Sequence, residues 1–127
     1  MEEAGDQLKV DVLALGRSVG LDAVGVTGAE PFPEVRAELE RRRAEGLHGG
    51  MQFTFRNPAR STDPRRILES ARSLVVGALR TPAPRLGEVG AGRLRIAAYA
   101  RHDHYATLRG HLECMADRIR SDGWTAR

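Results

Sequence analysis

The chain has 127 residues, of which 41% are hydrophobic and 29% charged, values typical of one soluble globular domain or of part of one. No run approaches the roughly 18 apolar residues of a membrane span, and the acidic start MEEAGDQLKV does not have the pattern of a secretory signal. We therefore expect a cytoplasmic protein without a membrane partner, and the net charge of +3 is too small to indicate nucleic-acid binding by itself.

The first half of the chain predicts a helix, a strand and a second helix. The first helix has an apolar stripe at helical spacing before Gly20, which can end it: Leu8, Val12, Leu15 and Val19. Residues 21–27 (LDAVGVT) alternate small and β-branched side chains, as a short buried strand does. Residues 29–47 then predict a surface helix with prolines at its start, Glu38 four residues before Arg42, and Gly46 at its end.

The second half predicts a loop, a brief helix, two strands and a last helix. Residues 57–64 form the loop, and Asp63 can cap a brief helix that runs from Pro64 through Ala71. Residues 73–79 (SLVVGAL) are apolar throughout, which predicts a strand buried on both faces. A Pro/Gly-rich connection (81–92) leads to a third strand at 93–100. The last helix has one apolar side: Tyr105, Leu108, Leu112, Met115 and Ile119.

This order predicts a mixed α/β or α+β fold, with a small mixed sheet of about three strands covered by helices. The chain stops soon after its last helix, and Trp124 has little sequence left to pack against. We therefore expect residues 1–127 to be an incomplete first domain of a larger protein.

The stretch YARHDHYATLR (99–109) holds both tyrosines of the chain and two of its four histidines. One explanation is a metal site of His104, His111 and Cys114, but the spacing lacks the tight pairs of zinc motifs, and one cysteine cannot by itself hold an iron–sulfur cluster. A second is a cofactor platform, since ligands commonly bind where a strand ends and a helix begins, and Tyr99 and Tyr105 offer flat surfaces. The third is an ordinary helix start, with Tyr105 in the core.

A second candidate region is GMQFTFRNPARSTDPRR (50–66). Phe53 and Phe55 alternate with polar residues and several arginines follow, a combination that suits nucleic acid or a large anionic cofactor. The alternative is that both phenylalanines are core residues and the arginines lie in a solvated loop.

Residues 46–79 (GLHGGMQFTFRNPARSTDPRRILESARSLVVGAL) and 92–109 (GRLRIAAYARHDHYATLR) resemble the N-terminal domain of epoxyqueuosine reductase. That family has a Gly-x-Met-x-aromatic segment, a basic loop before DPRxLLPGAxSVI, and then YAxGxDYHxxLR. The resemblance runs over most of residues 7–121. It implies a cytoplasmic tRNA-modifying oxidoreductase that uses cobalamin and two [4Fe–4S] clusters to reduce epoxyqueuosine to queuosine. In the family this domain covers part of the cobalamin, and a later ferredoxin-like domain holds the clusters.

Carried over by position, the resemblance implies cobalamin contacts at Arg60 and Ser61 and along the segment from Ala97 to Tyr99, and Tyr105 matches the motif tyrosine. The chain also departs from the family. The departures are His102 for glycine, His104 for aspartate, Ala106 for histidine, Ser61 for a common arginine, and LESA at 68–71 for LPGA. They indicate a divergent branch of the family, whose substrate can differ from that of the other members.

The family's proton-donating aspartate and cluster cysteines would follow residue 127. We therefore assign no catalytic or metal-binding residue, and we expect the chain to be the leading third of a reductase, or a truncated relative, that is inactive alone. The alternatives are a separate RNA- or anion-binding module that uses residues 53–66, and an interaction domain whose apolar edge pairs with a partner.

Overall fold

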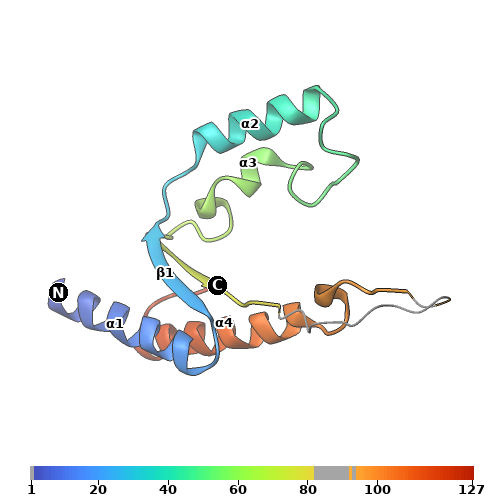
Figure 1. The fold of residues 1–127 in the computed structure, drawn as a ribbon. Helices are drawn as coiled ribbons and strands as arrows, with labels where there is room; N and C mark the ends of the chain where they lie inside the picture. Colours follow the sequence, from blue (N-terminus) through green and yellow to red (C-terminus); the bar gives the residue numbers. More distant parts are fainter. Residues whose placement is uncertain (1, 82–91, 93) are drawn as a thin grey trace. The chain divides into compact units, whose positions relative to one another are not determined.

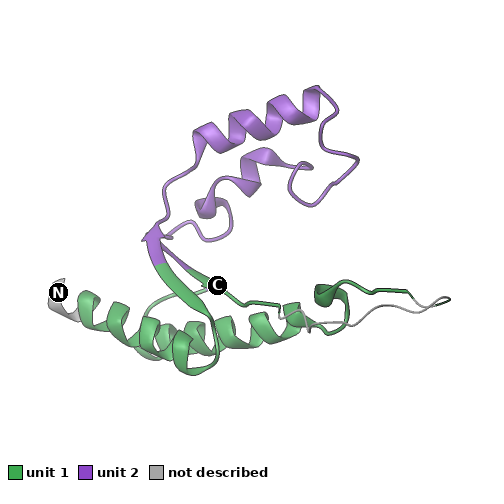
Figure 2. Ribbon diagram, viewed as in Figure 1, with its two compact units in different colours: residues 1–25, 76–126 green, residues 26–75, 127 purple. Residues whose placement is uncertain are grey.

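A computed structural model describes residues 2–81, 92 and 94–127 of the chain (Figure 1). The chain divides into two compact units, which we describe separately (Figure 2). Unit 1 comprises residues 1–25 and 76–126, and unit 2 comprises residues 26–75 and 127. The connection predicted at 81–92 lies largely outside the described residues.

In unit 1, helix α1 (Glu2–Ser18) packs against helix α4 (His104–Ser121). The core between them is small: Met115 is 1% exposed, Val12 2% and Leu21 4%. An ion pair of 3.1 Å between Arg118 Nη2 and Asp11 Oδ2 joins the two helices at their edge. Both helices confirm the sequence-based prediction, because the apolar stripes supply the buried face.

Helix α1 ends where the sequence predicts. Gly20 adopts a φ of 110°, a value that favours glycine, and the Leu21 amide bonds back to the Gly16 carbonyl at 3.0 Å. Strand β1 (Ala23–Gly28) follows and confirms the first predicted strand.

Strands β1 and β2 (Ser73–Ala78) form a two-stranded antiparallel sheet. The Asp22 amide donates to the Ala78 carbonyl at 2.9 Å, and the Ala29 amide donates to the Arg72 carbonyl at 3.2 Å. The prediction that the second strand is buried on both faces is wrong, since Val76 remains 55% exposed.

The third strand predicted at 93–100 is also wrong for the residues that the structure describes. Residues 94–97 have no regular secondary structure, and Ala98–Ala100 forms a 3-10 turn, η2. Leu94 is 93% exposed and Ile96 58%. The apolar alternation suits a strand, but a strand also needs a neighbour for its backbone groups, and no described strand bonds to this segment.

In unit 2, helix α2 (Pro33–Ala44) buries no residue and is covered by i,i+3 and i,i+4 ion pairs. Arg42 Nε lies 2.6 Å from Glu38 Oε1, which confirms the predicted pair. Helix α2 contacts a short helix, α3 (Pro58–Ser61), which the sequence assigned to a loop. We did not predict α3 because Asn57 and Pro58 are typical loop residues. In the structure the Asn57 side chain caps this helix.

The brief helix at 64–71 is shorter than predicted. It is a 3-10 turn, η1 (Pro64–Arg66), and the predicted cap is confirmed because the Asp63 carboxylate accepts a 3.1 Å hydrogen bond from the Arg65 amide. Ala29 (0% exposed), Thr62 (3%) and Pro58 are buried in unit 2. The fold class is a mixed α/β fold, as predicted, with two strands in the described part of the chain where about three were expected.

Candidate functional site

Both tyrosines are presented to solvent in unit 1. Tyr99 lies in η2 and is 69% exposed, and Tyr105 lies in the first turn of α4 and is 78% exposed. The explanation that Tyr105 begins the core stripe is therefore wrong; the buried residue of α4 is Met115. Neither phenol hydroxyl has a hydrogen-bond partner among the described residues. Both rings and both hydroxyls are thus available to a ligand.

Local hydrogen bonds fix the turn that carries these rings. Arg101 Nε donates to the Ile96 carbonyl at 2.8 Å, and the Ala100 amide donates to the Ala97 carbonyl at 3.0 Å. Asp103 caps α4 through a 2.8 Å bond from the Ala106 amide to its carboxylate. The backbone around the tyrosines is therefore set before any ligand binds.

The histidines of this segment do not make a metal site in the described part of the chain. The rings of His102 and His104 meet edge to face, with centroids 5.3 Å apart. No group of three or more His, Cys, Asp or Glu side chains that could hold a metal ion occurs among the described residues. The structure therefore does not bring His104, His111 and the exposed Cys114 together as ligands.

Arg60 and Ser61 lie in α3 of unit 2, apart in sequence from the tyrosine segment. The Asn57 side chain accepts a hydrogen bond of 3.1 Å from the Arg60 amide, while the Arg60 guanidinium has no partner among the described residues. The Ser61 hydroxyl donates to the Thr54 carbonyl at 2.9 Å. Arg60 can therefore bind an anion, whereas Ser61 holds the preceding loop and keeps only acceptor capacity for a ligand.

The two phenylalanines of the second candidate region differ in environment. Phe55 is half-buried, and its ring centroid lies 5.7 Å from that of His48. Phe53 is 85% exposed. The alternative that both phenylalanines are core residues is therefore confirmed in part for Phe55 and is wrong for Phe53.

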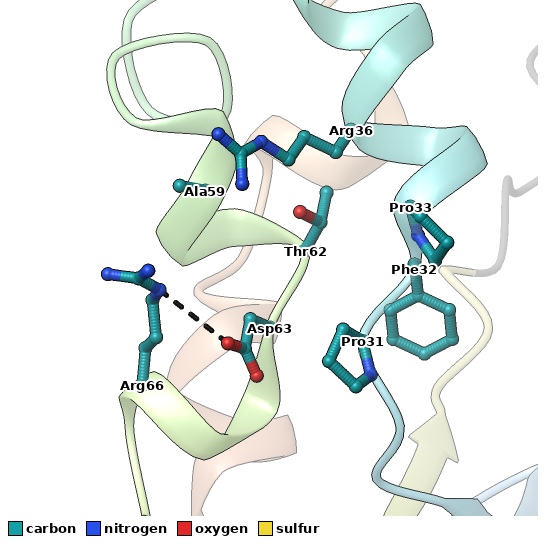
Figure 3. A pocket seen from close by; sticks show the side chains of 8 residues that line it. All are labelled: Pro31, Phe32, Pro33, Arg36, Ala59, Thr62, Asp63 and Arg66. Carbon is teal, nitrogen blue, oxygen red and sulfur yellow. Dashed lines mark ion pairs between the residues drawn. The ribbon is translucent and has the colours of Figure 1, made fainter.

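Unit 2 contains a small pocket of about 110 Å³ (Figure 3). One wall comes from the segment that starts α2 and the other from α3 and η1; the lining residues are Pro31, Phe32, Pro33, Arg36, Ala59, Thr62, Asp63 and Arg66. A 2.8 Å hydrogen bond from the Phe32 amide to the Thr62 carbonyl ties the walls together.

Both arginines of the pocket already have an acidic neighbour. Arg36 Nε lies 2.9 Å from Glu40 Oε1, and Arg66 Nε lies 3.5 Å from Asp63 Oδ2, toward which it points in Figure 3. Sites for organic ligands usually measure roughly 300–1,000 Å³. The pocket is thus too small and too nearly neutral for a large anionic cofactor, and none of the five predicted site residues lines it.

Neither this pocket nor the capping role of Asp103 was predicted from the sequence. The Pro-Phe-Pro run at 31–33 was a usable signal, because two prolines fix the backbone on either side of an aromatic ring. The Asp103 cap could also have been predicted from the sequence, since Asp is a preferred residue just before a helix.

Three curated relatives carry the same name. The chain is 32% identical over 120 residues to an epoxyqueuosine reductase of Staphylococcus aureus, a match that covers 91% of this chain and 31% of that protein. The chain is 27% identical to an epoxyqueuosine reductase of Bacillus subtilis, and this match also covers 91% of this chain and 31% of the relative. It is 31% identical over 78 residues to an epoxyqueuosine reductase of Bacillus anthracis, a match that covers 61% of this chain and 20% of the relative.

No family profile matches the chain, and no solved structure matches it. The chain thus spans about a third of the length of the Staphylococcus aureus relative. By sequence, the chain is similar to epoxyqueuosine reductases over 91% of its length.

Proposed function

We propose that residues 1–127 are the N-terminal, cobalamin-covering domain of a cytoplasmic oxidoreductase of the epoxyqueuosine reductase type. The reaction removes an epoxide oxygen from epoxyqueuosine in tRNA and leaves queuosine. The observation that carries this proposal is the similarity to epoxyqueuosine reductases, which extends over 91% of the chain.

The residues of unit 1 suit contact with a corrinoid. A corrin is a broad, nearly flat ring edged with amide groups, and the exposed rings and unpaired hydroxyls of Tyr99 and Tyr105 offer stacking surface and hydrogen bonds. The Ala97 amide has no acceptor among the described residues, so it can donate to a peripheral carbonyl. We assign these three residues of unit 1 to cobalamin binding.

In unit 2 we assign Arg60 and Ser61 to cobalamin binding. Cobalamin carries one phosphate, and the Arg60 guanidinium is a free cationic group suited to it. Ser61 can contribute only its oxygen lone pairs while its proton remains on the Thr54 carbonyl.

Cobalamin bound to such an enzyme would supply the reducing metal centre, and the assigned residues of this chain would bind and orient it. Two electrons and two protons are needed to convert the epoxide to an alkene and water. The single cysteine of the 127 residues cannot hold a [4Fe–4S] cluster. We therefore assign the clusters to a ferredoxin-like region outside these residues.

The proposal is tested by titrating the purified chain with hydroxocobalamin and following the visible absorption spectrum and the quantity retained on gel filtration. We expect saturable binding that weakens at least fivefold in Tyr99→Ala and in Arg60→Gln. Leu94→Ala is the matched control, because Leu94 is 93% exposed in the same unit and has no assigned role.

Histidine coordination to cobalt is a separate way to bind hydroxocobalamin, and His102 and His104 lie beside the tyrosines. A parallel titration with cyanocobalamin, whose cyanide occupies the exchangeable position, separates the two. Binding that is lost with cyanocobalamin, or that survives both substitutions, contradicts the assignment of these residues.

A further inference from the structure

The loop between α2 and α3 presents large apolar side chains to solvent. Phe53 is 85% exposed, Leu47 62% and Met51 52%. Single exposed apolar residues are ordinary, but three within seven residues of one loop need an explanation.

This loop is held in place by bonds to both neighbouring helices. Arg43 Nη1, from α2, donates to the Phe55 carbonyl at 3.1 Å, and the Ser61 hydroxyl, from α3, donates to the Thr54 carbonyl at 2.9 Å. These two acceptors directly follow Phe53 in the chain. The Phe53 ring is therefore presented from a fixed backbone, so a ligand that stacks on it does not have to order the loop.

The charge around Phe53 is positive. Residues 46–62 contain no aspartate or glutamate. The Arg56 side chain is exposed and has no ion pair or hydrogen bond among the described residues. By contrast, Arg36, Arg41 and Arg42 of α2 are all paired with glutamates. Arg56 thus remains free to pair with an anion from outside the chain.

From these observations we infer that residues 46–62 form a binding surface for a single-stranded polynucleotide, with a base stacked on Phe53 and a phosphate paired with Arg56. Any base has a face that stacks on an aromatic ring, and the backbone supplies an anion beside each base. A purely apolar protein partner would bury Arg56 without neutralising it, which is unfavourable. The two residues that carry this inference, Phe53 and Arg56, are not among the five residues assigned to the corrinoid; only the choice of RNA as probe rests on the proposed function.

The test is fluorescence anisotropy of the full chain with a labelled, unstructured oligoribonucleotide of about 12 nucleotides, within the size range of single-strand sites. Loss of a stacked base corresponds to roughly a 5- to 150-fold weaker affinity, so we expect a loss in that range for Phe53→Ala. Phe53→Trp should keep or increase affinity, and its indole fluorescence should be quenched by the oligonucleotide.

The phosphate contact has its own readout. In a plot of log affinity against log salt concentration, Arg56→Gln should reduce the slope by about 0.7, the value for one phosphate contact to a single strand. Leu94→Ala and Arg109→Gln are the controls, since both residues are exposed and lie in unit 1. Both should bind like the unmodified chain.

The inference is overturned if the oligonucleotide does not bind. It is also overturned if Phe53→Ala binds within twofold of the unmodified chain, or if the two unit 1 controls lose as much affinity as the loop variants. Corrinoid binding by the same Phe53→Ala sample shows that the variant is folded, and it keeps failure of this inference distinct from failure of the proposed function.

Discussion

Gly16 shows how closely the small core of unit 1 is packed. A methyl group at this position would lie 2.7 Å from Val24 Cγ2 and 3.0 Å from the Met115 Cε and Sδ atoms. Such distances require movement of a stiff β-branched side chain and of the most buried methionine. The absence of a side chain at Gly16 therefore lets α1 pack closely against Val24 and Met115.

Gly16→Ala should lower the free energy of unfolding by about 1–3 kcal/mol, because overpacking outweighs the better helix propensity of alanine. Gly110→Ala is the matched control: Gly110 lies inside α4 with open space around it, so this change should raise stability by about 0.5–1 kcal/mol. Urea unfolding followed by circular dichroism measures both. Equal effects of the two substitutions would show that the helices do not meet at Gly16.

At the scale of single elements, the N-terminal cap of α4 determines the backbone position of Tyr105, which lies in the first turn of this helix. Asp103→Ala removes the cap of the Ala106 amide and should cost about 0.5–2 kcal/mol of stability. Asp103→Asn keeps a side-chain acceptor and should cost much less. Thermal unfolding of the two variants measures the difference, and a similar loss in both would assign the effect to the charge of Asp103.

Helix α2 depends on charge pairs, since it buries no residue. Hydrogen bonds from Arg41 and then Arg42 lower the pKa of Glu38 from 4.5 to about 2. Because the folded pKa is below the unfolded value, the stabilisation is present above pH 4.5 and is lost as the pH falls toward 2. The groups are solvated, so high salt should weaken the effect.

An NMR titration of the Glu38 carboxyl carbon checks this expectation. At low ionic strength the midpoint should be well below 4.5, and it should move toward 4.5 in 1 M salt, where the Debye length is about 3 Å. A midpoint near 4.5 at low salt would mean that the Arg41 and Arg42 contacts do not persist in solution.

For the molecule as a whole, local sequence signals predicted which segments form helices and strands. They did not predict as well which of these elements are paired or buried. The helix of residues 104–121 follows from its apolar stripe, and the two confirmed strands follow from β-branched runs. The strand expected at 93–100 and the two-sided burial of β2 depended on neighbouring strands, which local sequence does not specify. The different environments of Phe53 and Phe55 likewise depend on the His48 ring and on hydrogen bonds from α2 and α3.

The candidate site was predictable to a similar degree. Position in the motifs picked out the tyrosines, and their exposure is consistent with a role in binding. Motif position did not predict that the Ser61 hydroxyl already donates to the Thr54 carbonyl, because that bond joins residues seven positions apart through the fold of the loop.

We propose that this chain binds a corrinoid through Ala97, Tyr99 and Tyr105 of unit 1 and through Arg60 and Ser61 of unit 2. The most direct test is a ¹H–¹⁵N NMR titration of the labelled chain with cyanocobalamin. We expect the largest, saturable amide shifts at residues 97–105 and 60–61, while α2 is unaffected. Shifts confined to other residues, or no shifts at all at saturating corrinoid, would contradict it.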